Sequence, residues 1–321
     1  MKVGVIGVGK MGKNHARIYS GMKDVDLVGI ADPDEKTGKQ IAEKHSCSYY
    51  SDHKELLAKG NLDAVSVCVP TFLHHRVAKD VIEKGVNLLI EKPIAGTMKE
   101  AEEIVSLSED RGLTLAVGHI ERFNPAVQEL KKLIDEGVLG DITSILARRV
   151  GLFPPRIKDA NVIIDIAVHD IDVFNYLLEK EPQNIFSCAG KAIIEDREDY
   201  ADIFLKYNGT NGIIEVNWIT PVKIRKLNVT GTKGYAELNY ITQDLTLFES
   251  VYKKEPDKFG DFVVKFGEPK KKTVKVRKKE PLKMELESFL DAVRKGTRPL
   301  VTGEDGLRVL KTATSIMKKC G

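Results

Sequence analysis

The chain has 321 residues, 42% of them hydrophobic, which is enough for the cores of two globular domains. Its 50 Lys and Arg residues against 47 Asp and Glu residues leave a net charge of +3, which excludes a strongly basic surface for nucleic acid or anionic lipid. No apolar run reaches the roughly 18 residues of a membrane span. The four cysteines have no metal-binding or disulfide spacing, so we expect free thiols and a cytoplasmic protein.

The first 32 residues predict, in order, a strand, a glycine-rich turn, a helix, a second strand and an acidic residue. Strand 2–6 leads directly into Gly7-Val8-Gly9-Lys10-Met11-Gly12, which matches G-x-G-x-x-G. Apolar residues then recur at helical spacing over 13–22, and a strand over 25–31 ends at Asp32. In this context the motif predicts a dinucleotide-binding site, whereas the glycine motif alone is weak evidence.

Each part of this segment has a physical reason to be there. Gly7 permits a tight turn, Gly9 lets a pyrophosphate approach the backbone, and Gly12 lets the helix pack against the sheet. The helix N-terminus favours the phosphates, and Asp32 can accept hydrogen bonds from the adenosine ribose. Because a carboxylate there would repel a 2′-phosphate, we expect NAD rather than NADP. The predicted cofactor contacts in this segment are Gly7, Gly9, Lys10, Met11, Gly12 and Asp32.

Strands and helices continue to alternate through the first half of the chain. We predict helices over 36–44, 53–59 and 76–84, and strands over 48–50, 64–69, 86–90 and 113–117. Such alternation is typical of βαβ units and a parallel sheet. The sequence therefore predicts a Rossmann dinucleotide-binding domain over 1–121.

Two segments follow the carboxyl ends of predicted strands, the edge at which open parallel sheets bind ligands. After the fourth strand, Pro70, Thr71 and His74 are predicted to border the cofactor, although His74 could instead be a polar residue of a helix N-terminus. Glu91-Lys92-Pro93 follows the fifth strand, which places Glu91 and Lys92 beside the cofactor. Lys92 is therefore a candidate catalytic residue, with an exposed turn lysine as the alternative.

The pattern changes in the second half, where strand signals follow one another with short turns. After a helix over 126–136 we predict strands over 143–150, 184–194, 200–207, 212–219, 226–230, 235–239 and 245–248, and final helices over 282–295 and 303–319. This predicts an α+β domain over 122–321 with a large open, mainly antiparallel sheet, and C-terminal helices that can pack back on the first domain. One long open sheet leaves a broad face and an edge to cover, so we expect oligomerisation through this sheet. The basic run 270–279 alternates Val with cations and predicts a charged edge strand rather than a nucleic-acid site.

A helix predicted over 163–178 carries Asp165 and His169 four residues apart on one face. A carboxylate beside a histidine raises its pKa, which makes the imidazole a usable acid or base near neutral pH. The alternative is a helix N-terminus with well-placed acids and a core histidine. One histidine with aspartates is a poor transition-metal ligand set, so we predict no metal.

Four cations surround the Phe-Pro-Pro stretch within 148–158, among them Arg149 and Arg156. These could form a clamp for an anionic substrate such as a sugar diphosphate, because arginine pairs well with phosphate. A solvated loop is the equally simple interpretation.

Taken together, the glycine fingerprint, the Glu91-Lys92-Pro93 triplet and the Asp165-x-x-x-His169 pair resemble the glucose–fructose oxidoreductase, inositol dehydrogenase and rhizopine catabolism (Gfo/Idh/MocA) family over nearly the whole chain. The resemblance implies an enzyme that oxidises a sugar hydroxyl to a ketone with NAD(P), and pairing through the open sheet. It also implies that Lys92 hydrogen-bonds the reacting hydroxyl, His169 is the general acid/base, and Asp165 orients His169 or the sugar.

The chain departs from many family members at Ala160-Asn161 and Ala167, where glycines are usual. The phrases 118–125 and 149–156 are similar to those of the nucleotide-sugar branch, which implies oxidation of the 3-hydroxyl of UDP-N-acetylglucosamine or a related substrate. A free sugar or polyol such as inositol is the alternative, and a non-catalytic regulator that binds NAD and sugar is a third. The implied substrate contacts are Arg122, Asn124, Arg149, Arg156, Asp165 and His169.

Overall fold

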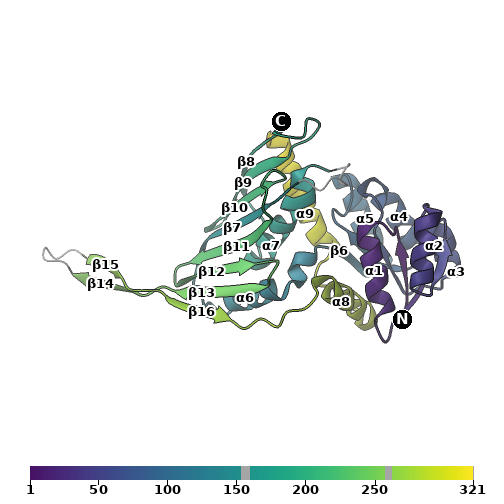
Figure 1. Cartoon of the computed structure of the whole chain (residues 1–321), viewed down its shortest axis with the longest axis horizontal. Helices are drawn as coiled ribbons and strands as arrows, with labels where there is room; N and C mark the ends of the chain where they lie inside the picture. The colour runs from purple at the N-terminus through teal and green to yellow at the C-terminus, as the bar shows by residue number, and fades with distance from the viewer. Residues whose placement is uncertain (153–159, 257–261, 321) are drawn as a thin grey trace. The chain divides into compact units, whose positions relative to one another are not determined.

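A computed structural model describes residues 1–152, 160–256 and 262–320 (Figure 1). The chain divides into two compact units, the first comprising Met1–Ile120 with Glu280–Lys311 and the second Glu121–Lys279 with Thr312–Gly321. The last boundary between the two units, after Lys311, falls within the final helix, α9 (Gly303–Cys320). None of the helices in the described part of the chain has the length and apolar character needed to span a membrane.

The first unit is built on a parallel six-stranded sheet with the order β3-β2-β1-β4-β5-β6. Its strands are β1 (Lys2–Ile6), β2 (Asp26–Ala31), β3 (Ser48–Tyr50), β4 (Ala64–Val67), β5 (Asn87–Glu91) and β6 (Leu115–Gly118). Strand β4 is buried at every residue, as expected for a central parallel strand covered on both faces. The strand order is that of a doubly wound dinucleotide-binding sheet, which confirms the predicted fold class.

Helices cover both faces of this sheet. They are α1 (Lys10–Ser20), α2 (Glu35–Lys44), α3 (His53–Lys59), α4 (Thr71–Glu83), α5 (Met98–Asp110) and α8 (Pro281–Lys295). One apolar core joins α1, α2 and α8, and α4 packs against both α3 and α5. The sequence analysis does not include α5, whose many charged residues obscure its apolar stripe. A capping box between Thr97 and Glu100 marks the start of α5, and its Thr-x-x-Glu pattern is the sequence signal that indicates this helix.

The second unit is built on an eight-stranded sheet with the order β16-β13-β12-β11-β7-β10-β9-β8. Its strands are β7 (Ile142–Val150), β8 (Asn184–Gly190), β9 (Tyr200–Tyr207), β10 (Thr210–Asn217), β11 (Ile224–Gly231), β12 (Gly234–Asn239), β13 (Asp244–Glu249) and β16 (Lys270–Val274). Only β7 and β10 pair in parallel among the described strands of this sheet, so the predicted mainly antiparallel sheet is confirmed. Strands β14 (Tyr252–Pro256) and β15 (Phe262–Phe266) form a separate pair that the sequence analysis does not include.

Helices pack against one face of this sheet, and among the described residues no helix lies on the other face (Figure 1). Helices α6 (Pro125–Asp135) and α7 (Val168–Leu178) lie on the same side of the strands (Figure 1). Along β9 the residues alternate, with Ala201, Ile203, Leu205 and Tyr207 buried. The lysine-rich β16 forms the edge of the sheet, as predicted, and its charges discourage pairing with another strand.

The helix predicted over 163–178 begins as a π-helical turn, Ile163–Ala167, and continues as α7. Asn161 holds the start of this turn, because its side-chain oxygen accepts the Ile164 N–H at 3.0 Å and its carbonyl accepts the Asp165 N–H at 3.0 Å. Single π-helical turns occur frequently at functional sites. The local geometry thus singles out the segment that carries the predicted acid and base.

The glycine turn gives a test of the packing. A Cβ on Gly12 would lie 1.8 Å from the Gly7 carbonyl oxygen, whereas a Cβ on Gly9 would meet nothing within 4 Å. We expect Gly12→Ala to destabilise the fold by about 1–3 kcal/mol or more, and the control Gly9→Ala to change it by less than about 0.5 kcal/mol. Urea unfolding would measure both, and equal midpoints for the two variants would contradict this packing.

Candidate cofactor and catalytic site

Asp32 organises the glycine turn at the end of β2. Its Oδ2 accepts the Val8 N–H at 2.7 Å and its Oδ1 accepts the Asp34 N–H at 2.8 Å. Gly7 has φ +86°, and a Cβ there would lie 2.8 Å from the Cys68 carbonyl, so only glycine suits this position. Each Asp32 oxygen keeps acceptor capacity for a ribose hydroxyl, and the carboxylate is held in place before any ligand arrives.

A pocket of about 200 Å³ lies beside Asp32, lined in part by Gly7, Val69, Leu73 and Arg76. These residues lie just beyond the carboxyl ends of strands or in the first half of α4, the end of the sheet where an adenosine group is expected in this fold. Arg76 is exposed and lines the pocket. The sequence analysis did not select Arg76, because it lies far from the glycine motif along the chain.

His74 is almost fully buried, with 1% of its surface exposed. Its Nδ1 lies 2.8 Å from the Pro93 carbonyl oxygen and its Nε2 lies 2.9 Å from the Val69 carbonyl oxygen. Burial lowers the pKa of His74, against the opposing effect of these carbonyl groups. The ring joins the end of β4 to the turn after β5. These contacts favour a positioning role over the direct cofactor contact predicted from the sequence.

Glu91 is 8% exposed, and its Oε1 lies 3.0 Å from Nε2 of His15. A Cβ on Gly118 would come within 3.0 Å of Oε2, so this glycine leaves room for the carboxylate. Burial raises the pKa of Glu91, but the hydrogen bond and charge of His15 and the charge of Lys92 outweigh it and lower the pKa overall. The half-buried Lys92 follows directly, and the Lys92–Pro93 peptide bond is cis.

His15 is a site residue that the sequence analysis missed. It lies three residues after the last glycine of the motif, on α1, and is fully buried. His15, Cys68 and Glu91 place one potential ligand atom each within 4.8 Å of one another. Nε2 of His15 is already bonded to Glu91, and burial raises the pKa of the Cys68 thiol well above its usual range. This chemistry favours a hydrogen-bonded pair beside a protonated thiol, and the absence of a metal stays a prediction.

In the second unit, Asp165 and His169 lie on one half-buried stripe. Ile166, Ala167 and Val168 between them are buried. Because a π-helical turn takes more than four residues, side chains four positions apart stay close to the same face. The helical spacing therefore keeps the predicted acid/base histidine and its carboxylate toward one face of this segment, and their catalytic roles stay a prediction. Lys92 belongs to the other unit.

Two of the three arginines predicted to bind substrate, Arg122 and Arg149, pair with aspartates of α7. Nη2 of Arg122 donates to Asp172 at 2.7 Å. Nε and Nη2 of Arg149 donate to Asp170 at 2.7 and 2.9 Å, and its Nη1 donates to Glu121 at 2.8 Å. Both arginines are 5% exposed. These contacts favour a structural role rather than a phosphate clamp.

Tyr240 completes the Arg149 cluster. Its ring centroid lies 4.5 Å from the Arg149 guanidinium carbon, and its hydroxyl donates to Asp170 at 3.1 Å. Asn124, also predicted to bind substrate, is 1% exposed. It caps α6, where its side-chain oxygen accepts the Ala126 N–H at 3.2 Å. Arg156 lies outside the described residues.

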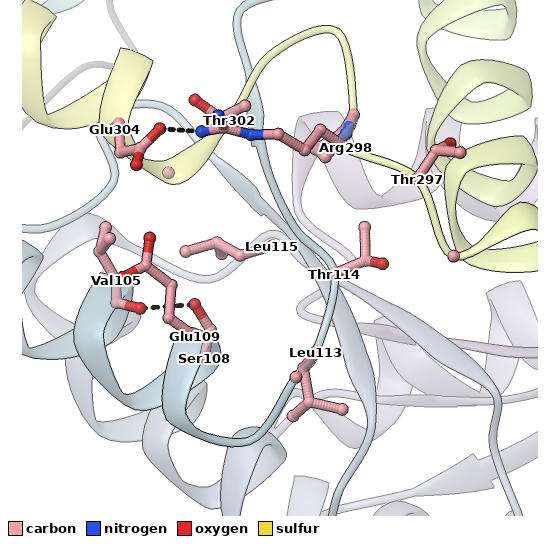
Figure 2. Close-up of a pocket in the computed structure, with 14 residues that line it drawn as sticks. Val105, Ser108, Glu109, Leu113, Thr114, Leu115, Thr297, Arg298, Thr302 and Glu304 are labelled. Carbon is pink, nitrogen blue, oxygen red and sulfur yellow. Dashed lines mark hydrogen bonds and ion pairs between the residues drawn. The ribbon is translucent and has the colours of Figure 1, made fainter.

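Another pocket in the first unit, of about 250 Å³, lies at the amino-terminal end of β6 (Figure 2). The segment from Leu113 to Leu115, which leads into β6, lines it together with the connection between α8 and α9. Arg298 pairs with Glu304 at its rim. Because this is the amino end of β6, the pocket is remote from the carboxyl edge where the cofactor is expected.

The strand order, the glycine turn and Asp32 define the first unit as a dinucleotide-binding Rossmann domain. Residues 1–119 match the family model described as an oxidoreductase family with an NAD-binding Rossmann fold, and residues 127–237 match the GFO/IDH/MocA C-terminal domain. The chain belongs to the GFO/IDH/MocA family of oxidoreductases, which confirms the resemblance seen in the sequence.

Relatives in this family match along the whole chain. A UDP-N-acetylglucosamine 3-dehydrogenase from Acidithiobacillus ferrooxidans is 29% identical over 317 residues, covering 98% of this chain and 96% of that protein. Its solved structure superposes with a TM-score of 0.86 at 28% identity, over 99% of this chain and 97% of that one. An inositol 2-dehydrogenase from Rhizobium meliloti is 26% identical, covering 99% of this chain and 96% of that protein.

The buried Glu91 carboxylate predicts a pH-dependent stability. Because its folded pKa is lowered, its contribution is complete above its unfolded pKa of about 4.3 and is lost as the pH falls through the folded value. We expect Glu91→Gln to be about 1.5–3 kcal/mol less stable than the wild type at pH 7, since it loses a charged hydrogen bond to His15. The difference in unfolding free energy between Glu91→Gln and the wild type should become smaller below a pH of about 4.

Urea unfolding at pH 7, 5 and 3.5 would measure this difference. A matched control is Glu103→Gln, which removes a more exposed carboxylate that also bonds a histidine, His75. Glu103→Gln should lower the free energy of unfolding by less than about 1 kcal/mol. A Glu91→Gln difference that stays constant with pH would contradict a charged carboxylate at this position.

Proposed function

We propose that this protein oxidises a ring hydroxyl of a nucleotide sugar to a ketone with NAD, and that the substrate is UDP-N-acetylglucosamine, oxidised at its 3-hydroxyl, or a close relative. The observation that carries this proposal is the full-length similarity to the Acidithiobacillus ferrooxidans enzyme, at 29% identity and a TM-score of 0.86. The Asp165–His169 stripe supplies the acid/base group that such a reaction needs.

The proposed roles follow from the chemistry of each side chain. Lys92 donates a hydrogen bond to the reacting hydroxyl, and His169 accepts the hydroxyl proton as that group becomes a carbonyl. Asp165 orients His169 and stabilises its protonated form. NAD supplies the acceptor for the hydride that leaves the sugar carbon. The protein itself provides position and proton transfer.

The choice of NAD over NADP is supported by Asp32. Its carboxylate is fixed by the Val8 and Asp34 backbone N–H groups beside the adenosine pocket. A 2′-phosphate there would lie against a negative charge. Arg76 lines the same pocket and is the side chain that could reduce this discrimination.

A free polyol is the second candidate substrate, supported by the similarity to inositol 2-dehydrogenase. A regulator that binds sugar without turnover is disfavoured, because the chain keeps Lys92 and His169. The cytoplasmic location stays a prediction. It agrees with Cys47, Cys68 and Cys188, which are free thiols in the described part of the chain.

Turnover is the direct test of this function. We expect an increase in reduced-nicotinamide absorbance with UDP-N-acetylglucosamine and NAD, and a smaller rate with NADP, inositol or glucose. Lys92→Ala and His169→Ala should each lower kcat by about 10²–10⁴-fold, because each removes a group that acts on the hydroxyl. Lys99→Ala, at an exposed position on α5, should leave the rate unchanged. Turnover with inositol alone would favour the second candidate.

We further propose a homodimer or homotetramer formed through the face of the second sheet that α6 and α7 do not cover. Phe186 is 60% exposed and Ile213 is 37% exposed. Phe186 packs beside Phe204, with ring centroids 6.1 Å apart. Arg148 and Glu215 form an ion pair on the same face. Exposed apolar side chains on a broad sheet support burial against another copy.

Light scattering after size exclusion would test this assembly. A lysine in place of Phe186 should shift the protein toward the monomer, because it buries an unpaired charge in the contact. Ile241→Lys is a matched control, since Ile241 is 54% exposed but lies in the turn between β12 and β13. A wild-type monomer, or an assembly unaffected by Phe186→Lys, would refute the proposed interface.

A further inference from the structure

A second arginine lies directly opposite Arg149 in the sheet of the second unit. In the antiparallel register of β7 and β11, Arg225 pairs with Arg149. Side chains of directly opposed residues point to the same face of a sheet. Arg149 contacts Asp170 of α7, so Arg225 lies on the face that packs against α7. Helix α7 also carries His169, and Asp165 lies in the π-helical turn that precedes it.

The guanidinium of Arg225 is held by backbone, not by carboxylates. Its Nη1 donates to the Val150 carbonyl at 2.5 Å and to the Ile224 carbonyl at 2.9 Å. Over the three described ranges of the chain, no carboxylate forms an ion pair with Arg225, in contrast to Arg122 and Arg149. Three N–H donors remain on Nε and Nη2. The side chain is half-buried, and its bonds to the two backbone carbonyl groups fix the position of the guanidinium.

The charged groups that act on Arg225 include Asp165 of the Asp165–His169 stripe. Burial lowers its pKa, and so does the neighbouring Arg149, while Asp170, Glu121 and Asp165 oppose them. Asp170 and Glu121 are already bonded to Arg149. Asp165 belongs to the Asp165–His169 stripe, so its carboxylate is one of the charges that act on Arg225.

Gly151 and Lys223 lie beside this guanidinium. A Cβ placed on Gly151 would meet only ordinary contacts, at 3.6 Å from the Lys223 Cα and 3.8 Å from Nη1 of Arg225. Lys223 is exposed and adds a second cation beside Gly151. A planar guanidinium with free donors matches the oxygens of a phosphate group better than an isolated ammonium does.

We infer that Arg225 binds the diphosphate of a nucleotide-sugar substrate, in the role that the sequence assigned to Arg149. This inference rests on the proposed function and names the residue that selects a substrate bearing a diphosphate. Arg149 cannot take the role, because both Nε and Nη2 bond Asp170 and Nη1 bonds Glu121. Arg225 therefore separates a nucleotide sugar from a free polyol.

The test compares Arg225→Ala and Arg225→Gln with the wild type. Gln keeps a donor for the Val150 carbonyl and removes the charge, so it retains the local structure if Ala does not. Arg148→Ala is the matched control, because Arg148 precedes Arg149 but lies on the opposite face, paired with Glu215. Circular dichroism melting would verify the fold of each variant. The probe is UDP alone, measured by calorimetry, together with the KM for UDP-N-acetylglucosamine.

We expect both Arg225 variants to raise the Kd for UDP and the KM for UDP-N-acetylglucosamine by about tenfold to a hundredfold, as for loss of a charge-assisted hydrogen bond. The effect on kcat should be smaller, since Arg225 does not touch the reacting hydroxyl in this proposal. Added NaCl should weaken UDP binding to the wild type more than to Arg225→Gln. Arg148→Ala should bind UDP as the wild type does.

Two negative outcomes have different meanings. If the wild type reduces NAD with UDP-N-acetylglucosamine and folded Arg225→Gln binds UDP equally well, the inference is overturned and the proposed function stands. If the wild type neither binds UDP nor turns over the nucleotide sugar, both are overturned. An equal loss of UDP binding in Arg148→Ala would also overturn the inference, because it would show a general effect of charge.

Discussion

Two buried aspartates on α7 constrain the second unit more than any other interaction described. Asp170 and Asp172 are fully buried, and an unpaired buried charge is costly, with loss of one partner typically worth about 3–5 kcal/mol. Arg149 and Arg122 must therefore meet them from β7 and from the segment before α6. This fixes the rotation of α7 about its axis. Because His169 directly precedes Asp170, the rotation that buries the aspartate sets the direction of the histidine.

The same principle arranges the cofactor edge of the first unit. Asp32 bonds the Val8 N–H, His74 joins the Val69 and Pro93 carbonyl groups, and Glu91 bonds His15. Each contact ties a strand end to a neighbouring turn or helix. A binding edge built from such polar links is held in shape before the cofactor arrives, which reduces the ordering that binding would otherwise require.

The sequence predicted those features whose signals are local. The glycine turn, the triplet at Glu91 and the Asp165–His169 spacing each lie within a few residues, and the two sheet types follow from the alternation of elements. The pairing of Arg149 with Asp170 and of Arg122 with Asp172 depends on tertiary packing across 21 and 50 residues of chain. Without it, these arginines resemble free cations and were assigned to the substrate. The π-helical turn also has no distinct sequence signal.

The sheet of the second unit explains why adjacent residues can differ in role. Arg148 and Arg149 look like a single basic cluster in the sequence, yet neighbouring residues of a strand point to opposite faces. Arg148 pairs with Glu215 on one face, and Arg149 is buried against α7 on the other. Arg225 shares the second face but comes from the next strand. The register between strands therefore decides which cations share a face of the sheet, and a count of cations along one loop cannot identify them.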